Sequence, residues 1–413
     1  MRISSSLVFQ TGLKTINTQQ SDLLHLYQQI GTGQKMVTPA DDPLGASQAI
    51  NLSQSQALNA RYADNRAVAN QNLGTEEDAL NSLTLLLQDV RTRLVEASNG
   101  TLSDADRATL SNVLKNARDS LMGIANVTDG NGQYLFSGSE GSTPAYGAAG
   151  NYQGDALQRD IQADQTRRIA GSDVGSDVFE RAQPGTRAYA SYAAAANTGT
   201  AVLGQPGVRD NAAGNSAANY SFEINFSSPT TYTVDVLDMS TTPPTPVPAP
   251  PGSPFTLAPG AKELDLGYGT AVQISGTPAT GDHFDVKPLQ HENINLFETF
   301  DSVIAALNTP AQGNDQVMAS LRNVMNTAMQ RMASNYDNVL TVRASVGARM
   351  NELTALENTG SQRNLGYAKA LSNIEDLDYY EASTQLSLRK MALEGAGLAF
   401  QTIQSLSLFN RNS

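Results

Sequence analysis

The stretch MASLRNVMNTAMQRMASNYDNVLTVRASVGARMNELTAL, residues 318–356, carries the strongest periodic pattern in the chain. Steps of three and four residues from Met318 reach Leu356 without a slip, and ten of the twelve positions are apolar. The two polar positions are Asn335 and Arg349. Apolar residues at such steps form one stripe along an α-helix. The stretch therefore predicts a helix with an apolar seam of about 58 Å, and this seam needs a helical partner.

The prolines indicate where such a partner can lie. All 17 of them avoid residues 44–143 and 311–413, and seven crowd into residues 243–254. A proline inside a helix removes a hydrogen bond and clashes with the preceding turn. The chain therefore divides into two helical arms, one from each end, around an irregular middle. The predicted fold class is mainly α with a β-rich insert, in which both termini build a long antiparallel helical bundle or coiled-coil rod.

The N-terminal arm contains a break at TPADDP, residues 38–43. A short heptad pattern precedes it over residues 10–30, and a much longer helical pattern follows it. Asp42 is well placed to cap the second helix, because Pro43 at the first helical position loses no hydrogen bond there. A third helix is expected to open with a capping box that runs from Ser103 to Asp106.

The middle of the chain changes to a period of two. YSFEINF at 220–226 and TYTVDVLDM at 231–239 alternate as strands do, and residues 262–288 alternate again. Residues 185–219 show no clear period. The proline-rich run at 243–254 predicts an extended loop between strands. The middle is therefore expected to be a mostly β insert.

One turn-rich segment has a calcium-like spacing. Asp129, Asn131, Gln133 and Glu140 occupy the first, third, fifth and twelfth positions of a loop. The sixth position, however, is Tyr134, where a helix–loop–helix calcium site requires glycine. Asn131 followed by glycine is a strong hairpin signal. A hairpin turn is therefore the better interpretation.

Composition excludes several classes of function. The net charge of −13 argues against binding to nucleic acid or to an anionic membrane surface, since both need clustered basic residues. The chain has no cysteine, which excludes disulfides, thiol catalysis and cysteine-ligated metals. It has no run of 18 apolar residues and no signal peptide at its start. These features predict a cytoplasmic chain, unless it leaves the cell by a route that uses no such signal.

Catalytic constellations are scarce. The three histidines, His25, His283 and His291, fit no known metal or nucleophile pattern, and chance spacing explains them better. The pair Asp41 and Asp42 precedes a proline, so helix capping explains it better than acid–base catalysis. A solvated helix face is the simplest interpretation of three further acidic residues, Glu375, Asp376 and Asp378. We therefore predict no enzyme activity and no catalytic, cofactor-binding or metal-binding residues.

The two chain ends are amphipathic. An isolated helix of this size is marginal in water, so its apolar face needs a partner. The ends can pair with each other and still expose a face to other subunits. The predicted assembly or coiled-coil interface consists of apolar residues from both ends, namely Leu13, Ile16, Leu23, Tyr27, Ile30, Leu386, Leu393, Phe400, Ile403 and Leu406.

The same two ends carry a resemblance to a known family. MRISSS at residue 1 and IGTGQKMVTPADDPLGASQAI at 30–50 resemble the N-terminal region of the bacterial flagellin superfamily. VGARMNEL at 346–353 and LSNIEDLDYYEASTQLSLRKMALEGAGLAF at 371–400 resemble its C-terminal region. Within the superfamily, NGQYLFSG at 131–138 and YQGD at 152–155 are more similar to the proteins of the hook–filament junction than to flagellin. Two matches in the right order are more specific than either alone.

The resemblance implies a flagellin-like fold with three domains. Residues 1–42 and 365–413 would form a terminal coiled-coil domain in the axial core of a tube. Residues 43–144 and 290–364 would form a helical rod domain with a β-hairpin, and residues 145–289 a β-rich outer insert domain.

It also implies a role and a set of partners. The chain would be a structural adaptor at the hook–filament junction of the bacterial flagellum, exported by the flagellar type III system. Its partners would be copies of itself in a ring or helical lattice, the hook-side junction protein (hook-associated protein 1), flagellin and an export chaperone. No nucleic acid, membrane insertion or cofactor is implied.

Three alternatives stay open at this point. The chain could be flagellin itself, which would polymerise alone into filaments. It could be an enzyme whose site lies in the insert, although the insert lacks a cluster of histidine and acidic residues with metal spacing. It could be a cytoplasmic coiled-coil scaffold, which would explain the heptads but not the motifs at both ends.

Overall fold

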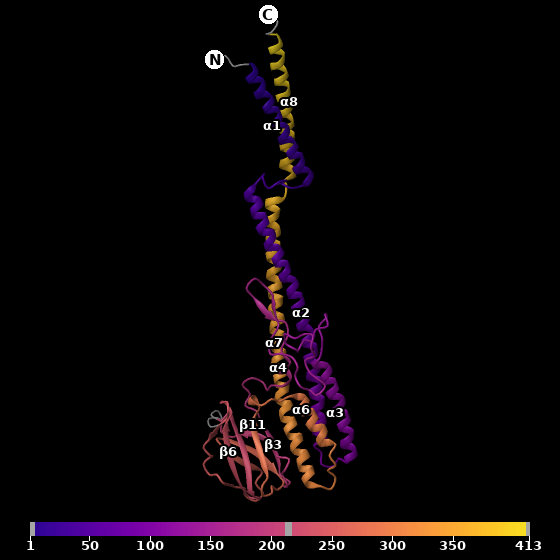
Figure 1. Ribbon diagram of the computed structural model, residues 1–413, viewed down its shortest axis with the longest axis vertical. Helices are drawn as coiled ribbons and strands as arrows, with labels where there is room; N and C mark the ends of the chain where they lie inside the picture. The colour runs from indigo at the N-terminus through magenta and orange to yellow at the C-terminus, as the bar shows by residue number, and fades with distance from the viewer. Residues whose placement is uncertain (1–4, 211–216, 410–413) are drawn as a thin grey trace. The chain divides into compact units, whose positions relative to one another are not determined.

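The computed structural model describes residues 5–210 and 217–409, with only the backbone for Ser5, Ser6, Val8 and 403–409. The chain forms two compact units. Unit 1 contains residues 1–64 and 355–413, and unit 2 contains residues 65–354. Two long helices, α2 (Pro43–Ala97) and α7 (Asp315–Glu375), contribute to both units. Figure 1 colours the chain from its N-terminus to its C-terminus and labels the elements.

Unit 1 contains the terminal helices α1 (Ser5–Thr32) and α8 (Tyr379–Phe409), which pack along each other. Gly33, which has a φ of 72°, follows the last residue of α1, as a left-handed residue often does at a helix end. Helix α2 begins at Pro43, and the Asp42 carboxylate accepts a hydrogen bond from the Gly45 amide at 3.0 Å. The predicted cap at the TPADDP segment is therefore confirmed.

The helical part of unit 2 contains the remainders of α2 and α7 together with α3 (Asp104–Ala125) and α6 (Leu296–Leu307). Helix α3 opens with the predicted capping box, in which Ser103 and Asp106 exchange hydrogen bonds. The leucine seam of α2 is fully buried here, as at Leu73 and Leu80. The helices of unit 2 therefore have a complete apolar core of their own.

The predicted seam of α7 is continuous, and Gly360 does not interrupt the helix. The helix runs unbroken from Asp315 to Glu375, and the Gly360 carbonyl also accepts a hydrogen bond from the Asn59 side chain at 2.8 Å. The two polar seam positions have polar partners. The Asn335 amide donates to the Phe179 carbonyl at 3.2 Å, and Arg349 forms an ion pair with Asp173. These partners explain how polar residues are accommodated in an otherwise apolar seam.

The β-rich part of unit 2 consists of two antiparallel sheets around one apolar core. The larger sheet has the order β3-β11-β5-β6-β7, with β8 also paired to β6, and the smaller sheet has the order β4-β10-β9. Their bounds are β3 Tyr189–Ala193, β4 Val202–Val208, β5 Tyr220–Ser228, β6 Thr231–Asp238, β7 Thr245–Val247, β8 Phe255–Thr256, β9 Glu263–Gly267, β10 Thr270–Ser275 and β11 His283–Pro288. We call residues 189–288 the insert.

The segment between α3 and the insert is mostly irregular. It contains a small hairpin of β1 (Asp160–Gln162) and β2 (Arg168–Ala170) and the short helix α4 (Gly175–Phe179). Another short helix, η1 (Leu289–His291), follows the insert. The calcium-like segment is a turn, since the Asp129 carboxylate accepts the amides of Asn131 and Gln133 at 2.8 and 2.9 Å. The segment forms a single antiparallel bridge between Tyr134 and Thr128.

The middle of the chain contains strands that the sequence pattern does not show, and the expectation for its proline-rich run is wrong. Residues 185–219, which have no clear period, contain the strands β3 and β4. The proline-rich run is not simply a loop, because β7 pairs with β6 within it. A proline is tolerated in β7 because that strand lies at the edge of its sheet.

Candidate assembly surface

The pair of α1 and α8 buries one apolar seam. On α1, the least exposed positions are Ile16, Leu23, Leu26 and Ile30, and on α8 they include Leu386 and Leu393. Gly12 lies against Phe400, and a Cβ at Gly12 would come within 2.9 Å of the Phe400 ring. The Phe400 ring also packs on Phe9, with 5.1 Å between ring centroids. The small residue therefore lets an aromatic ring fill the space between the helices.

The predicted interface residues fall into three groups. Ile16, Leu23 and Ile30 on α1, and Leu386, Leu393 and Phe400 on α8, are half-buried in the pair. Leu13 and Tyr27 are exposed instead, because the half-buried line of α1 passes one residue earlier, through Gly12, Gln19 and Leu26. Ile403 and Leu406 belong to α8, but their side chains lie outside the described part of the structure.

The pair leaves large apolar side chains uncovered. Leu398 keeps 66% of its surface exposed and Met391 keeps 59%. Both helices contribute large exposed apolar side chains, which we together call the terminal apolar surface: Leu7, Phe9, Leu13, Leu24 and Tyr27 from α1, and Tyr379, Tyr380, Leu388, Met391 and Leu398 from α8. Exposed apolar side chains gathered on one element indicate an interaction site. The heptad pattern of the sequence could not separate these residues from the seam, because residues such as Leu13 and Tyr27 are apolar and have heptad spacing as well.

The connection between α1 and α2 is bound to the connection between α7 and α8. The Lys35 amide donates to the Glu375 carbonyl at 2.7 Å, and the Leu377 amide donates to the Gly33 carbonyl at 3.0 Å. Asp378 caps α8 by accepting the Tyr380 amide at 2.9 Å. The acidic residues before α8 therefore act here through main-chain contacts and capping.

A second anchor holds the α1–α2 connection on α1. The Asp41 carboxylate accepts the amides of Val37 and Thr38 at 2.9 and 2.8 Å, and it lies 3.1 Å from the His25 imidazole. The amide of Thr38 makes the largest contribution in lowering the pKa of Asp41 to about 2. His25 therefore has a structural partner within unit 1.

The remaining histidines lie in unit 2. His283 lies 2.7 Å from the Asn225 amide oxygen and 3.0 Å from the Asp285 carboxylate. His291 lies beside a cavity of about 640 Å³ near α4, and its ring Nε2 lies 2.9 Å from the Asn219 amide oxygen, which accepts the hydrogen bond. Among the described residues, no three histidine, aspartate or glutamate side chains are grouped so that they could hold a metal ion.

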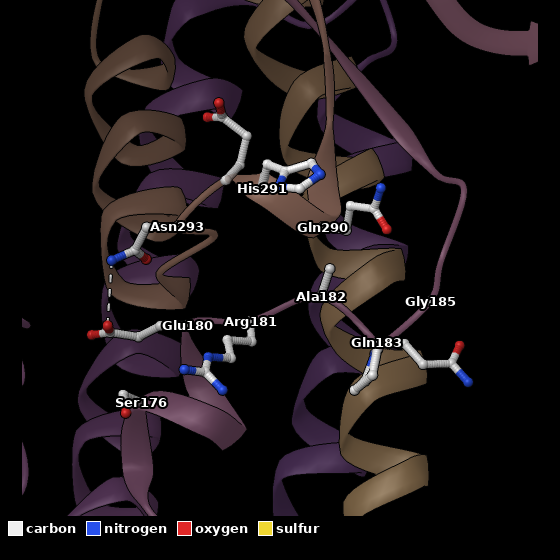
Figure 2. Close-up of a pocket in the computed structure, with 11 residues that line it drawn as sticks. Ser176, Glu180, Arg181, Ala182, Gln183, Gly185, Gln290, His291 and Asn293 are labelled. Atoms are coloured by element: carbon white, nitrogen blue, oxygen red, sulfur yellow. Dashed lines mark hydrogen bonds between the residues drawn. The ribbon is translucent and has the colours of Figure 1, made fainter. Parts of the chain in front are cut away.

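The cavity also contains a carboxylate with a shifted pKa. Burial raises the pKa of Glu180, and both of its oxygens accept side-chain amides, from Asn293 at 3.3 Å and from Asn295 at 2.9 Å. Figure 2 shows Glu180 turned toward Asn293 and away from His291. Because these groups are bound to neighbouring structural residues, we assign no catalytic role to them.

Within the described ranges, no helix is both long enough and apolar enough to cross a lipid bilayer.

Comparisons with known proteins agree with this arrangement. Residues 3–141 match the family model of the bacterial flagellin N-terminal helical region. The flagellar hook-associated protein 3 of Salmonella typhimurium is 29% identical over 413 residues and is covered, like this chain, over its full length. The protein of the same name from Escherichia coli is 28% identical over 99% of both chains.

Solved structures give the same result. The crystal structure of FlgL from Xanthomonas campestris aligns with a TM-score of 0.65 and 27% identity, over 78% of this chain and 99% of that one. That of hook-associated protein 3 from Legionella pneumophila aligns with a TM-score of 0.64 and 26% identity, over 80% and 98%.

Flagellins match only in part. The B-type flagellin of Pseudomonas aeruginosa is 32% identical over 150 residues, which are 33% of this chain and 30% of that protein. The paired terminal helices and the match over residues 3–141 are features of the flagellin type of chain. Over its full length, the chain is similar to flagellar hook-associated protein 3.

Proposed function

We propose that the protein is a structural subunit of the bacterial flagellum that forms the adaptor at the hook–filament junction and is exported by the flagellar type III system. Full-length similarity to hook-associated protein 3 from two bacteria supports this role. The observation that carries the proposal is the terminal apolar surface, because it leaves residues such as Leu398 exposed on a helix pair that is already formed. Such a surface requires a neighbouring subunit.

The partners follow from this position. Copies of the chain would pack through α1 and α8 into a ring or helical lattice, in which each contact is head-to-tail. The hook-side junction protein, hook-associated protein 1, would lie on one side and flagellin on the other. A chaperone would cover α8 before export, because an exposed amphipathic helix favours association. The three-domain division, with a terminal core, a helical rod and an outer insert, belongs to the same proposal.

The role proposed is structural throughout, and no catalysis is assigned to the insert. Flagellin itself is the second candidate, since the helical arms are shared. The flagellins, however, align with only about a third of the chain, as in the 33% covered by the Pseudomonas aeruginosa protein, whereas the junction proteins align with all of it. This difference favours the junction over the filament.

The experiment tests the terminal apolar surface in a bacterium that lacks its own copy of the gene. A variant with Leu388→Ser, Met391→Ser and Leu398→Ser should be made and exported but should leave hooks without attached filaments. The control is Leu85→Ser, which changes a leucine of similar exposure in unit 2 and should leave motility unchanged. Electron microscopy of labelled protein should place it at the hook–filament boundary.

Two results would contradict the proposal. Normal filaments on cells that carry the triple variant would show that the terminal apolar surface is not needed for assembly. Label along the whole filament would favour flagellin instead.

A further inference from the structure

The insert presents two edge strands to helix α7. Among the described strands, β3 pairs only with β11 and β4 pairs only with β10, so each is the outer strand of its sheet. An edge strand leaves main-chain N–H and C=O groups unpaired, and these groups can recruit another chain. In this protein both edges meet the first half of α7.

Side chains of α7 bind these main-chain groups as a neighbouring strand would. The Asn323 side chain donates to the Ala201 carbonyl and accepts the Leu203 amide, both at 2.9 Å. The Asn326 side chain donates to the Leu203 carbonyl at 2.8 Å. One amide side chain therefore both donates and accepts along β4, which is what a strand on that side would do.

Strand β3 is bound by the next residues of α7. The Gln330 side chain accepts the Ser191 amide at 2.8 Å and donates to the Gly204 carbonyl at 3.2 Å, so it joins β3 to β4. The Thr327 hydroxyl donates to the Ser191 carbonyl. We call the polar residues of α7 that bind the insert the α7 ladder: Gln316, Asn323, Asn326, Thr327 and Gln330.

The spacing of the α7 ladder follows the helix. Steps of seven, three, one and three residues keep these side chains on one face. Asn323 keeps only 7% of its surface exposed, and Ser191 keeps 4%. Water is therefore largely excluded from the contact, and each main-chain group depends on its α7 partner.

The apolar core of the insert does not include α7. Its buried members, among them Phe222, Val234, Leu264 and Phe284, all lie between Tyr189 and Val286. The insert thus has its own core. The contacts described above between α7 and the strands β3 and β4 are polar. A polar contact can be exchanged for water without opening an apolar core.

Two covalent connections also join the insert to the rest of unit 2. They are residues 180–188 and 289–295, which bind each other through the Ile294 amide and the Glu180 carbonyl at 2.9 Å. The cavity of about 640 Å³ lies between them and α4. Figure 2 shows both connections passing this cavity, with Gln183 and Gly185 on one and Gln290 on the other. Ala182, Leu289 and Ile294 of the same connections are buried in a small apolar cluster with Ala190 of β3. Bending is therefore assigned to the positions that line the cavity.

We propose that the α7 ladder is a releasable latch, which holds an independently cored insert in one orientation while residues 180–188 and 289–295 act as its hinge. Release would swing the insert without unfolding it. The latch goes beyond the proposed function, because it concerns how the outward part of the subunit is mounted and not how subunits assemble.

The test uses the full chain with Asn323→Ala, Asn326→Ala and Gln330→Ala. The matched control is Asn335→Ala with Asn338→Ala, on the same helix, whose side-chain amides bind the Phe179 and Asp177 carbonyls outside the insert. Hydrogen exchange should become at least about tenfold faster in β3 and β4 of the triple variant, while β5 and β6 stay protected. The control should leave all four strands protected.

A distance measurement tests the hinge directly. The chain has no cysteine, so spin labels can be placed at Val208→Cys on β4 and Leu340→Cys on α7, both partly exposed positions. The distance distribution should be narrow in the parent and the control and broad in the triple variant. A narrow distribution in the triple variant, simultaneous loss of protection in β5 and β6, or failure of the triple variant to fold would each overturn the latch.

Discussion

The two units differ in how completely they bury their apolar side chains. In unit 2, leucines of α2 such as Leu73, Leu80 and Leu94 have no exposed surface. In unit 1, α1 and α8 bury one seam between them and leave leucines such as Leu24, Leu388 and Leu398 largely exposed. Both units are built from helices with heptad patterns. Under the proposed function, neighbouring subunits would cover the exposed side chains of unit 1, whereas the buried leucine seam of α2 is covered by unit 2 itself.

The largest expected effect comes from making the same type of substitution, leucine to alanine, in each of the two units. Leu80→Ala should lower the free energy of unfolding of unit 2 by about 3 kcal/mol, because it leaves a cavity in a packed core. Leu398→Ala should change stability by less than about 0.5 kcal/mol, because the side chain is exposed in the isolated subunit. Denaturant unfolding followed by circular dichroism measures both. Equal losses would remove the distinction between the units.

A buried carboxylate gives unit 2 a dependence on pH. Glu76 on α2 has no exposed surface, and it accepts the Asp173 amide at 3.0 Å. Burial, with a further contribution from the Asp173 carboxylate, raises the pKa of Glu76 well above its usual range. The protonated form is therefore favoured in the folded state. Its contribution to stability is complete below the ordinary pKa of glutamate and is lost as the pH rises through the raised pKa.

Glu76→Gln should flatten this dependence, since the glutamine oxygen can still accept the Asp173 amide and the side chain never becomes charged. The free energy of unfolding, measured from pH 5 to pH 9, should fall with rising pH in the parent and much less in the variant. The control is Glu77→Gln, which removes the partly exposed ion pair with Arg343 and should keep the slope of the parent. A parent whose stability is constant over this range would contradict the prediction.

The sequence could predict the helices because their boundaries are local. Asp42 and the pair Ser103 and Asp106 cap helices through residues a few positions away, so their roles are visible in the sequence. The strands β3 and β4 could not be found in this way. Both are edge strands whose other side is bound by α7, and no alternation of residues records a partner that lies more than a hundred positions away.

The apolar seam between α1 and α8 was predictable only in part. The residues Ile16, Leu23 and Ile30 lie in the helix pair, while Leu13 and Tyr27 lie outside it. The heptad pattern of α1 fits two registers, one that buries Leu13 and Tyr27 and one that buries Gly12 and Leu26. Phe400 fixes the register in the structure, because its ring requires the small residue Gly12 opposite it. That requirement acts between chain ends, so the spacing within α1 cannot show it.

The smallest expected effect compares one glycine from each unit. Gly74 lies inside α2 with open space where a Cβ would stand, whereas a Cβ at Gly12 inside α1 would meet Phe400 at 2.9 Å. Alanine favours a helix over glycine by about 1 kcal/mol. Gly74→Ala should therefore stabilise unit 2 by up to about 1 kcal/mol, with no effect elsewhere.

Gly12→Ala should gain the same helix propensity but displace the Phe400 ring, so the pair of α1 and α8 should loosen. Hydrogen exchange of α8 in the monomer measures this loosening, and it should be faster in Gly12→Ala than in the parent. Gly12→Ala with Phe400→Leu is the control, because the smaller side chain makes room for the Cβ and should restore slow exchange. If exchange in α8 were slower in Gly12→Ala than in the parent, the close contact with Phe400 would not set the register of the terminal helices.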